Sequence, residues 1–473
     1  MTFADTAAAP LSNLPPLEDI QAQDAAHHWH PFTDTADLNA RGTRVIKSAE
    51  GCWLTEAQGR RLLDGMAGLW CVNVGYGRDE IVEAVARQMR ELPYYNTFFQ
   101  CTHPPATELA GMLAEVYPPH MKRSFFTVGG SDANDTAYRL AQVYWQSMGK
   151  PTKTAFIARK NAYHGSTVLG ASLGGMAAMH GQGGSAVREV HHIDQPYWFG
   201  EGRPHGLTPE EFGLQRARAL EAKIDELGED NVAAFIAEPI QGAGGVVIPP
   251  ETYWPEIKRI CAEREILLIA DEVISGFGRF GTWFGCQSFD FEPDMMSMAK
   301  GLTSGYQPMG AVAISEKVAE PLMAHAGEVF HGYTYSGHPA ACAAAIANLR
   351  IIREEGLVER VRDDIGPYLG QRWASLEDHP LIGQTRSRGL IGAAELVKRK
   401  EPDIELFPNR GTIGARCRDI CVRNGLVMRA VGDSMIISPP LIITRDEVDR
   451  LVELARKSFD DLADALSREG ALA

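Results

Sequence analysis

From about residue 75 onward, short apolar runs alternate with longer stretches of helical character. The runs read SFFTV, TAFIA, AAFIA, ILLIA and AVAI, and helical stretches such as DANDTAYRLAQVYWQSMG and ETYWPEIKRICAERE lie between them. Continuous runs rich in Val, Ile and Phe are typical of strands buried on both faces, and their alternation with helices predicts a mostly parallel sheet. The predicted fold class is therefore α/β.

The pattern changes near residue 335, where the Ala-rich helical stretch HPAACAAAIANLRIIREEG begins. Mixed strand and helix pieces follow it to a charged amphipathic end. A chain of 473 residues is also long for one ordinary core. We therefore expect a loose Ala- and Pro-rich tail, a small domain built from both chain ends, and a large domain between them; the expected segments are 1–26 (tail), 27–74 (small domain), 75–335 (large domain) and 336–473 (small domain).

Charge and composition exclude several classes of partner. The formal net charge is −15, and no cluster of Lys and Arg of the kind that binds nucleic acid or anionic membranes is present. The N-terminal residues lack the basic start and apolar stretch of a signal peptide, and no apolar run approaches the roughly 20 residues that span a bilayer. We expect a cytoplasmic protein with no nucleic-acid or membrane partner.

Cysteines and clustered histidines raise the question of a metal. The eight cysteines are scattered without a CxxC pair, as in a chain kept reduced. Cys417 and Cys421 lie four apart on a predicted helix, and helix packing is favoured over half of a metal site because no His pair follows. His27, His28 and His30 lie close together, but no carboxylate or cysteine is spaced to complete a set with them. We expect no metal.

The residues that follow each apolar run form the candidate site, because ligands of parallel sheets bind at the carboxyl ends of the strands. GGSDAND follows SFFTV. Gly129 and Gly130 allow a tight turn there, and a helix begins beside the Ser131 hydroxyl. The free N–H groups and the dipole of that helix predict a phosphate cradle, although Ser131 or Asp132 could equally be an ordinary helix cap.

Two acids and an aromatic residue follow the next runs. Glu238 comes directly after AAFIA and Asp271 after ILLIA, which places them at neighbouring strand ends. Helix capping, or pairing with Arg279, would explain either acid taken alone. Tyr163 and His164 follow TAFIARKNA and offer an aromatic platform beside a glycine; a core aromatic with a satisfied polar tip is the alternative.

Lys300 ends the methionine-rich segment PDMMSMAK, where the chain becomes glycine-rich. Most long lysine stems bury while the head stays wet, but a lysine that leaves water must be paired, neutralised or used covalently. One cofactor accounts for the cradle, the acid, the ring and the lysine together. Pyridoxal phosphate carries a phosphate, a ring nitrogen best kept protonated by a carboxylate, a flat ring that stacks, and an aldehyde that a lysine captures.

At this point the chain resembles a known family from about residue 28 onward. It is similar to the class III, fold type I pyridoxal-phosphate aminotransferases, and most similar among them to the ω-amino-acid and amine:pyruvate transaminases. The segments that carry the resemblance, in chain order, are HPFTD, DGMAGLWCVNVGYG, YYNTFF, GGSDANDTA, AYHG, AEPIQGAGG, LIADEVISGFGR, AKGLTSGYQPMGA and YTYSGHP. The resemblance implies a large domain with a mostly parallel central sheet flanked by helices, and a smaller α+β domain from both chain ends.

The resemblance also implies roles for individual residues. Lys300 binds the cofactor aldehyde and Asp271 pairs with the pyridine nitrogen. Tyr163 and Val273 pack on opposite faces of the ring. The implied catalytic residues are Lys300, Asp271 and Tyr163. The implied cofactor contacts are Gly130, Ser131, Asp132, Tyr163, His164, Glu238, Asp271, Val273, Lys300 and Thr334 of the partner subunit in a homodimer. The implied substrate pocket contains Phe32, Trp70, Tyr163, Ala243, Arg429, and Phe98 and Phe99 of the partner subunit.

Three residues indicate which branch of the family the chain resembles. Arg429, in GLVMRAVGD, matches the mobile arginine that binds the carboxylate of the keto acid, and a surface arginine at a strand end is the alternative. Asp132 stands where many relatives carry Glu. Ile274 stands where several branches carry a Gln that contacts the phenolic oxygen of the cofactor, and this difference favours the amine:pyruvate branch.

The expected activity is transfer of an amino group from a primary amine or ω-amino acid to a keto acid, with pyruvate as the expected acceptor. The cofactor would cycle between pyridoxal phosphate and pyridoxamine phosphate in ping-pong kinetics, with Lys300 moving the proton. A sister diamine, taurine or diaminopelargonate aminotransferase, a decarboxylating relative, and a non-catalytic protein that senses the cofactor remain alternatives. A nucleotide-binding dehydrogenase is excluded because no G-x-G-x-x-G follows the first strand. The exact amine, the enantiomer, and the choice between dimer and tetramer stay open.

Overall fold

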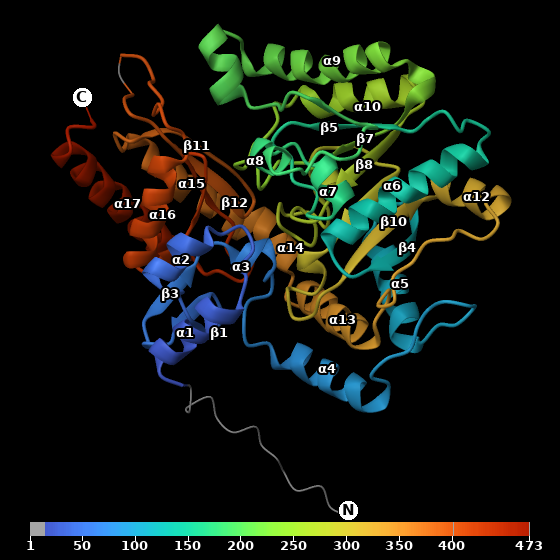
Figure 1. Cartoon of the computed structure of the whole chain (residues 1–473), viewed down its shortest axis with the longest axis horizontal. Helices are drawn as coiled ribbons and strands as arrows, with labels where there is room; N and C mark the ends of the chain where they lie inside the picture. The colour runs from blue at the N-terminus through green and yellow to red at the C-terminus, as the bar shows by residue number, and fades with distance from the viewer. Residues whose placement is uncertain (1–14, 401, 473) are drawn as a thin grey trace, which may run out of the picture.

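The computed structural model describes residues 15–400 and 402–472, and its described strands form three sheets (Figure 1). The largest sheet has seven strands in the order β4-β10-β9-β8-β7-β5-β6. Their bounds are Met121–Thr127 (β4), Gly310–Ser315 (β10), Met295–Met298 (β9), Leu267–Asp271 (β8), Val232–Ala237 (β7), Ala155–Arg159 (β5) and Val190–Ile193 (β6). All neighbouring pairs are parallel except those of β10, which runs antiparallel to both β4 and β9. The predicted mostly parallel sheet is confirmed.

Helices cover both faces of the seven-stranded sheet. Every residue of β5, β7 and β8 is buried, and successive side chains enter opposite cores: Phe156 lies in one core and Ile157 in the other. The first core contains side chains of α6 (Gly130–Ser147) and α12 (Glu316–His325). The second contains side chains of α5 (Pro104–Val116), α9 (Pro209–Leu227), α10 (Tyr253–Glu263) and α13 (Pro339–Glu354). Strands buried on both faces explain the continuous apolar runs of the sequence.

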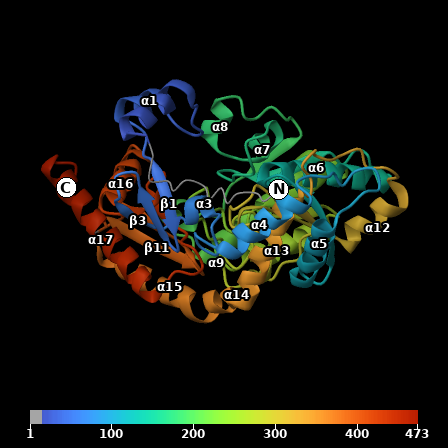
Figure 2. The same ribbon diagram turned by 90° about the horizontal axis from the view of Figure 1, so that it is seen from below.

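The two chain ends meet in the smaller sheets. One sheet has the order β1-β2-β3-β13, and the other has the order β11-β12-β15-β14. Their bounds are Ile46–Glu50 (β1), Trp53–Glu56 (β2), Arg61–Asp64 (β3), Leu426–Val427 (β13), Ile382–Arg388 (β11), Ile391–Leu396 (β12), Ser434–Ile437 (β15) and Arg429–Val431 (β14). Because β13 pairs in parallel with β3, the N-terminal and C-terminal segments lie side by side, as the blue and red elements of Figures 1 and 2 show. This arrangement confirms a smaller α+β part drawn from both ends.

The remaining helices connect and cover these sheets. Their bounds are Leu17–His27 (α1), Thr35–Arg41 (α2), Ala67–Trp70 (α3), Asp79–Glu91 (α4), Val168–Leu173 (α7), Ala177–Gly181 (α8), Gly285–Ser288 (α11), Leu357–Arg360 (α14), Gly366–Ala374 (α15), Thr412–Arg423 (α16) and Arg445–Arg468 (α17). The long α17 begins with a capping box of Thr444 and Glu447. Its amphipathic pattern buries one face, which explains the charged end of the sequence.

The segment that was expected to be a loose tail, residues 1–26, includes most of helix α1. This helix follows Pro16 and carries Glu18 and Asp19 in its first turn, and none of its residues is buried. Residues 1–14 of the segment lie outside the described residues. The eight cysteines are all free, and Cys417 and Cys421 are buried on α16. None of the described helices is both long enough and apolar enough to cross a membrane.

Candidate active site

A cavity of ≈ 150 Å³ opens at the carboxyl ends of β5, β7, β8 and β9. It is lined by Gly130, Ser131, Asn134, Tyr163, His164, Gly165, Glu238, Asp271, Val273, Ile274, Ala299 and Lys300. Most of these residues are predicted cofactor contacts, because parallel strands bring the residues that follow them to one edge of the sheet. Four lining residues were not among the predicted contacts: Asn134, Gly165, Ile274 and Ala299.

Lys300 lies at this edge in a strained backbone conformation. It follows β9 through the extended residue Ala299 and begins a single 3₁₀ turn, with φ of +46°. A non-glycine residue in this region costs about 1–3 kcal/mol and is common at functional sites. The amine Nζ donates to no acceptor among the described residues and lies 5.3 Å from the ring centroid of Trp70. Burial lowers the pKa of Lys300, although Cys71 and Asp271 partly oppose the effect. The site therefore favours a neutral, unpaired amine.

Asp271 is the last residue of β8 and carries a fully buried carboxylate. Its Oδ2 accepts hydrogen bonds from His164 Nδ1 at 2.7 Å and from Asn134 Nδ2 at 2.8 Å, and its Oδ1 accepts one from Val273 N at 3.0 Å. Burial alone would raise the pKa of Asp271, but the hydrogen bond and charge of His164, with the bonds from Asn134 and Val273, outweigh burial and lower it. The carboxylate is therefore held ionised at the wall of the cavity.

Two polar atoms beside Asp271 have no partner among the described residues. They are Nε2 of His164 and Oδ1 of Asn134, and both are buried. Asn134 also donates to the carbonyl of His164 at 2.8 Å, so one amide fixes both neighbours. Sequence reasoning missed Asn134, although its place three residues after Ser131, on the same face of α6, was a usable signal.

Glu238 holds the backbone of the aromatic platform. Its Oε1 accepts from Tyr163 N at 3.2 Å and its Oε2 from Gly242 N at 2.9 Å. Burial raises the pKa of Glu238. Pairing with Arg279, one alternative for both acids, is wrong: Arg279 instead donates to Asn73 Oδ1 at 2.7 Å and to the carbonyl of Leu390 at 3.1 Å. This buried arginine joins the large sheet region to both chain ends.

The turn that is predicted to bind phosphate lies at the start of helix α6. This helix begins at Gly130, and no side chain of the described residues caps it, so the ordinary-cap alternative is not observed and the first N–H groups have no partner among those residues. A Cβ at Gly130 would lie 3.1 Å from the methyl groups of Val273, and one at Gly165 would lie 2.6 Å from Ser131 Oγ. Both glycines therefore allow close approach. Asp132 follows in the first turn of the helix but does not line the cavity.

The predicted substrate residues of this chain lie beside the cavity. The ring centroid of Phe32 is 6.2 Å from that of Tyr163, and Ala243 is buried in the same apolar cluster as Trp70. Arg429 lies over Trp70, with Cζ 4.9 Å from the ring centroid, and makes no hydrogen bond or ion pair with described residues. Burial lowers its pKa, so it is not the surface arginine of the alternative interpretation.

Three predicted residues do not reach the cavity of their own chain. Phe99 is 87 % exposed, and its ring lies 5.8 Å from that of Phe98. Thr334 is exposed, and its carbonyl accepts from Tyr94 OH at 2.8 Å. This placement is consistent with the expectation that these residues act from a partner subunit, and it stays a prediction.

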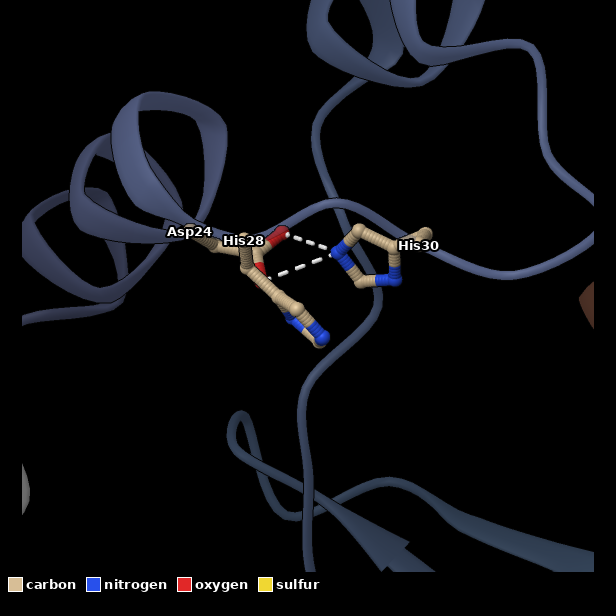
Figure 3. Close-up of side chains that lie close together, drawn as sticks. All are labelled: Asp24, His28 and His30. Carbon is tan, nitrogen blue, oxygen red and sulfur yellow. Dashed lines mark hydrogen bonds and ion pairs between the residues drawn. The ribbon is translucent and has the colours of Figure 1, made fainter.

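The expectation that no carboxylate joins the N-terminal histidines is wrong. Asp24 accepts from His28 Nδ1 at 2.9 Å and from His30 Nε2 at 2.8 Å (Figure 3). The three ligand-type side chains lie within 4.8 Å of one another, and the bonds join α1 to the segment that carries Phe32. Sequence reasoning missed Asp24 because it treated that part of the chain as a loose tail, whereas a helix places positions i and i+4 on one face.

These residues fit pyridoxal phosphate. The free N–H groups of α6 suit a phosphate, the ionised Asp271 suits a protonated ring nitrogen, and the unpaired Lys300 suits an aldehyde. Fold and cavity together define a cofactor-dependent group-transfer enzyme.

Comparison with known proteins gives the family. The family model for class III aminotransferases matches residues 37–458, and the chain belongs to this family of pyridoxal-phosphate-dependent aminotransferases, whose structures have fold type I. The chain is 55 % identical over 446 residues to putrescine–pyruvate aminotransferase of Pseudomonas aeruginosa, covering 94 % of this chain and 97 % of the relative.

Solved structures of omega-transaminases superpose closely on this chain. An (S)-enantioselective omega-transaminase from Thermomicrobium roseum superposes with a TM-score of 0.89 at 41 % identity, covering 94 % of this chain and 99 % of that one. The omega transaminase from Pseudomonas jessenii in complex with PMP superposes with a TM-score of 0.91 at 38 % identity, covering 95 % and 99 %. The predicted family and fold class are confirmed.

Proposed function

We propose that this enzyme transfers the amino group of a primary amine, with a short diamine such as putrescine as the first candidate, to pyruvate, using pyridoxal phosphate held by Lys300. The observation that carries the proposal is the pairing of an unpaired, neutral-leaning Lys300 amine with an ionised, buried Asp271 in one cavity. The similarity to putrescine–pyruvate aminotransferase over nearly the whole chain supports the substrate pair.

Each residue at the cavity has a defined task. Lys300 would hold the cofactor aldehyde through Nζ, and the same Nζ would act as the base that moves the proton of the substrate Cα. Asp271 keeps the ring nitrogen protonated, and His164 and Asn134 keep Asp271 ionised. When bound, the cofactor supplies the electron sink that stabilises the carbanion at Cα. A lowered pKa keeps Lys300 able to accept that proton at neutral pH.

The remaining cofactor contacts orient the group. The backbone N–H groups of Gly130, Ser131 and Asp132 bind the phosphate at the start of α6. Tyr163 and Val273, which line the cavity, enclose the ring. Glu238 supports Tyr163 through its backbone N–H. In this proposal residues 75–335 form the cofactor-binding domain, and residues 27–74 and 336–473 form the small domain.

The substrate side of the cavity must take two different molecules in turn. Phe32, Trp70 and Ala243 offer an apolar wall for the carbon chain of an amine, and the rings can stack against a second ammonium group. Arg429 then binds the carboxylate of pyruvate through charge-assisted hydrogen bonds. Phe98 and Phe99 of the partner subunit and Thr334 of the partner subunit complete the site in a cytoplasmic homodimer.

A panel of amines and acceptors tests the proposal. Putrescine, β-alanine and 1-phenylethylamine enantiomers are each paired with pyruvate or 2-oxoglutarate, and formation of alanine or glutamate is followed with Lys300→Ala as the blank. The expected result is alanine formation from putrescine at least about 10-fold faster than glutamate formation, since a pocket built around a small monocarboxylate discriminates by about this factor or more. Preferential glutamate formation would assign a sister aminotransferase activity, and no turnover with intact cofactor binding would leave a non-catalytic binding protein.

A further inference from the structure

Trp70 projects toward the cavity from an unusually strained turn. Ala67, Gly68 and Trp70 have φ of +46°, +66° and +58°, and Gly68 and Leu69 leave helical geometry altogether. Non-glycine residues cost about 1–3 kcal/mol each in such conformations, so this turn forms only where its surroundings enforce it. A local device must therefore hold it.

That device is the carboxylate of Asp64, at the end of β3. Oδ1 accepts from Met66 N at 2.9 Å, and Oδ2 accepts from Gly68 N at 2.7 Å and from Tyr76 OH at 2.7 Å. Asp64 is 0 % exposed, so these three donors replace the water that it gives up on burial. Its two oxygens fasten the first half of the turn, at Met66 and Gly68.

The turn places the ring of Trp70 beside two cations, Lys300 of the cavity and the neighbouring Arg429. Trp70 is 3 % exposed, and Lys300 Nζ and Arg429 Cζ lie 5.3 Å and 4.9 Å from its ring centroid. Asp64 also pairs in register with Val427 of β13, two residues before Arg429. Asp64 is thus the common anchor of the aromatic wall and of the strand that leads to the arginine.

We propose that Asp64 is a specificity-determining positioning residue, which rests on the proposed function: its carboxylate fixes the turn that sets Trp70 against Lys300 and Arg429, and so sets the width of the amine pocket. Asp64 touches no reacting atom. Releasing the turn lets the Trp70 ring move, which widens the pocket for bulky amines and weakens the fit of short ones.

Two variants and one matched control test this role. Asp64→Asn replaces one carboxylate oxygen, an acceptor, by an amide nitrogen that cannot accept a hydrogen bond. Tyr76→Phe removes one of the three donors and is a milder change, in case the first variant folds poorly. Asp294→Asn is the control, because Asp294 is also buried and accepts from a backbone N–H, that of Leu268, at the opposite edge of the sheet. All three variants are expected to lose stability, but only the first two are expected to alter the pocket.

The kinetic readout is the ratio of kcat/KM for 1-phenylethylamine to kcat/KM for putrescine. Asp64→Asn is expected to raise this ratio about 10-fold, Tyr76→Phe less, and Asp294→Asn by under about 2-fold. In a Trp70→Ala background, Asp64→Asn is expected to change the ratio by under about 2-fold, because residues that act through one another are not additive. A full effect in that background, or an unchanged ratio with Trp70 present, would overturn the proposal.

The second readout needs neither cofactor nor turnover. Acrylamide quenching of Trp70 fluorescence is measured in the cofactor-free protein, as the difference between each variant and its matching Trp70→Phe protein. The quenching is expected to rise about 3-fold in Asp64→Asn, because the buried Trp70 ring becomes accessible to acrylamide. It is expected to stay unchanged in Asp294→Asn. Unchanged quenching in Asp64→Asn would overturn the positioning role. This result is independent of whether Lys300 carries the cofactor, so it separates failure of this inference from failure of the proposed function.

Discussion

Two lysines, Lys153 buried and Lys300 partly buried, lie at opposite edges of the same sheet. Lys153 precedes β5, is 2 % exposed, and donates from Nζ to the carbonyls of Glu229, Val232 and Glu265 at 3.0, 3.2 and 3.1 Å. Lys300 follows β9 at the carboxyl edge and donates to no described acceptor. Burial lowers the pKa of both. A structural lysine thus has all three of its donors satisfied, whereas Lys300 has an amine left free to react.

The same contrast extends to the other charges at the two edges. At the amino edge, Lys150 pairs with Glu265 at 2.9 Å and Arg264 with Glu229 at 3.2 Å. Near the cavity, the guanidinium of Arg429 lies over the ring of Trp70 and has no ion pair with the described residues. At the amino edge these charges are paired, whereas Lys300 and Arg429, both beside the Trp70 ring, have no paired acid among the described residues, so a ligand could complete them.

The largest effect is expected for Lys300→Met. Turnover should fall at least about 1,000-fold, because both the covalent hold and the proton transfer are lost. The free energy of unfolding of the cofactor-free protein should rise, since a partly buried amine without a described partner is removed. Steady-state rates and urea unfolding measure the two changes. A variant that keeps ordinary turnover would remove the contrast between the two lysines.

Lys153→Met should give the opposite result. The buried carbonyl of Val232 and the part-buried carbonyls of Glu229 and Glu265 lose their donor, so the free energy of unfolding should fall by about 2–4 kcal/mol. Turnover per folded, cofactor-loaded molecule should stay within about 2-fold of the parent. Urea unfolding and active-site titration check both numbers. A large loss of turnover with unchanged stability would place function at the amino edge.

Arg429→Leu extends the test to the second unpaired cation. The KM for pyruvate should rise about 10- to 100-fold, because a charge-assisted hydrogen bond to the carboxylate is lost. The KM for putrescine should change by under about 3-fold. Arg264→Leu is the control, because its charge is paired at the amino edge. Equal changes in both KM values of the first variant would show that Arg429 shapes the pocket without binding a carboxylate.

The smallest effect is expected for Asn134→Ala, and it depends on pH. Asn134 helps to lower the pKa of Asp271, so its stabilisation is present above the unfolded-state pKa of Asp and is lost as pH falls through the folded-state pKa. The variant should be less stable by about 1–2 kcal/mol at pH 7, and this gap should narrow on acidification. Urea unfolding of both proteins at fixed ionic strength between pH 7 and pH 3 measures this difference in the free energy of unfolding. A difference that stays constant over this pH range would assign the loss of stability to the hydrogen bond with the His164 carbonyl instead.

The sequence predicted those features that follow from strand ends. Residues directly after buried runs, such as Glu238, Asp271 and Lys300, meet in one cavity because parallel strands align their ends. Strand β9 was harder to recognise, since MMSM lacks β-branched residues and becomes a strand through its pairing with β8 and β10. The residues that flank it nevertheless indicated Lys300, which lines the cavity.

Other features of the site depend on tertiary geometry that the pattern of residues along the sequence does not indicate. The clamp of Asp64 on the Trp70 turn needs positive φ at non-glycine residues, which only tertiary contacts enforce. The bonds of Asp24 to its histidines depend on a helix in a segment of weak apolar pattern. Exposed residues such as Phe99 gain a role only if a second subunit covers them, and one chain does not determine that contact.

Reduction of the purified, cofactor-loaded enzyme with borohydride, followed by peptide mapping, tests the central claim most directly. We predict that the cofactor becomes fixed to the peptide containing Lys300, with Lys153 and the other lysines unlabelled and with no label in Lys300→Met. A label on another lysine, or a protein that stays unlabelled while it still turns over amine and pyruvate, would contradict the account.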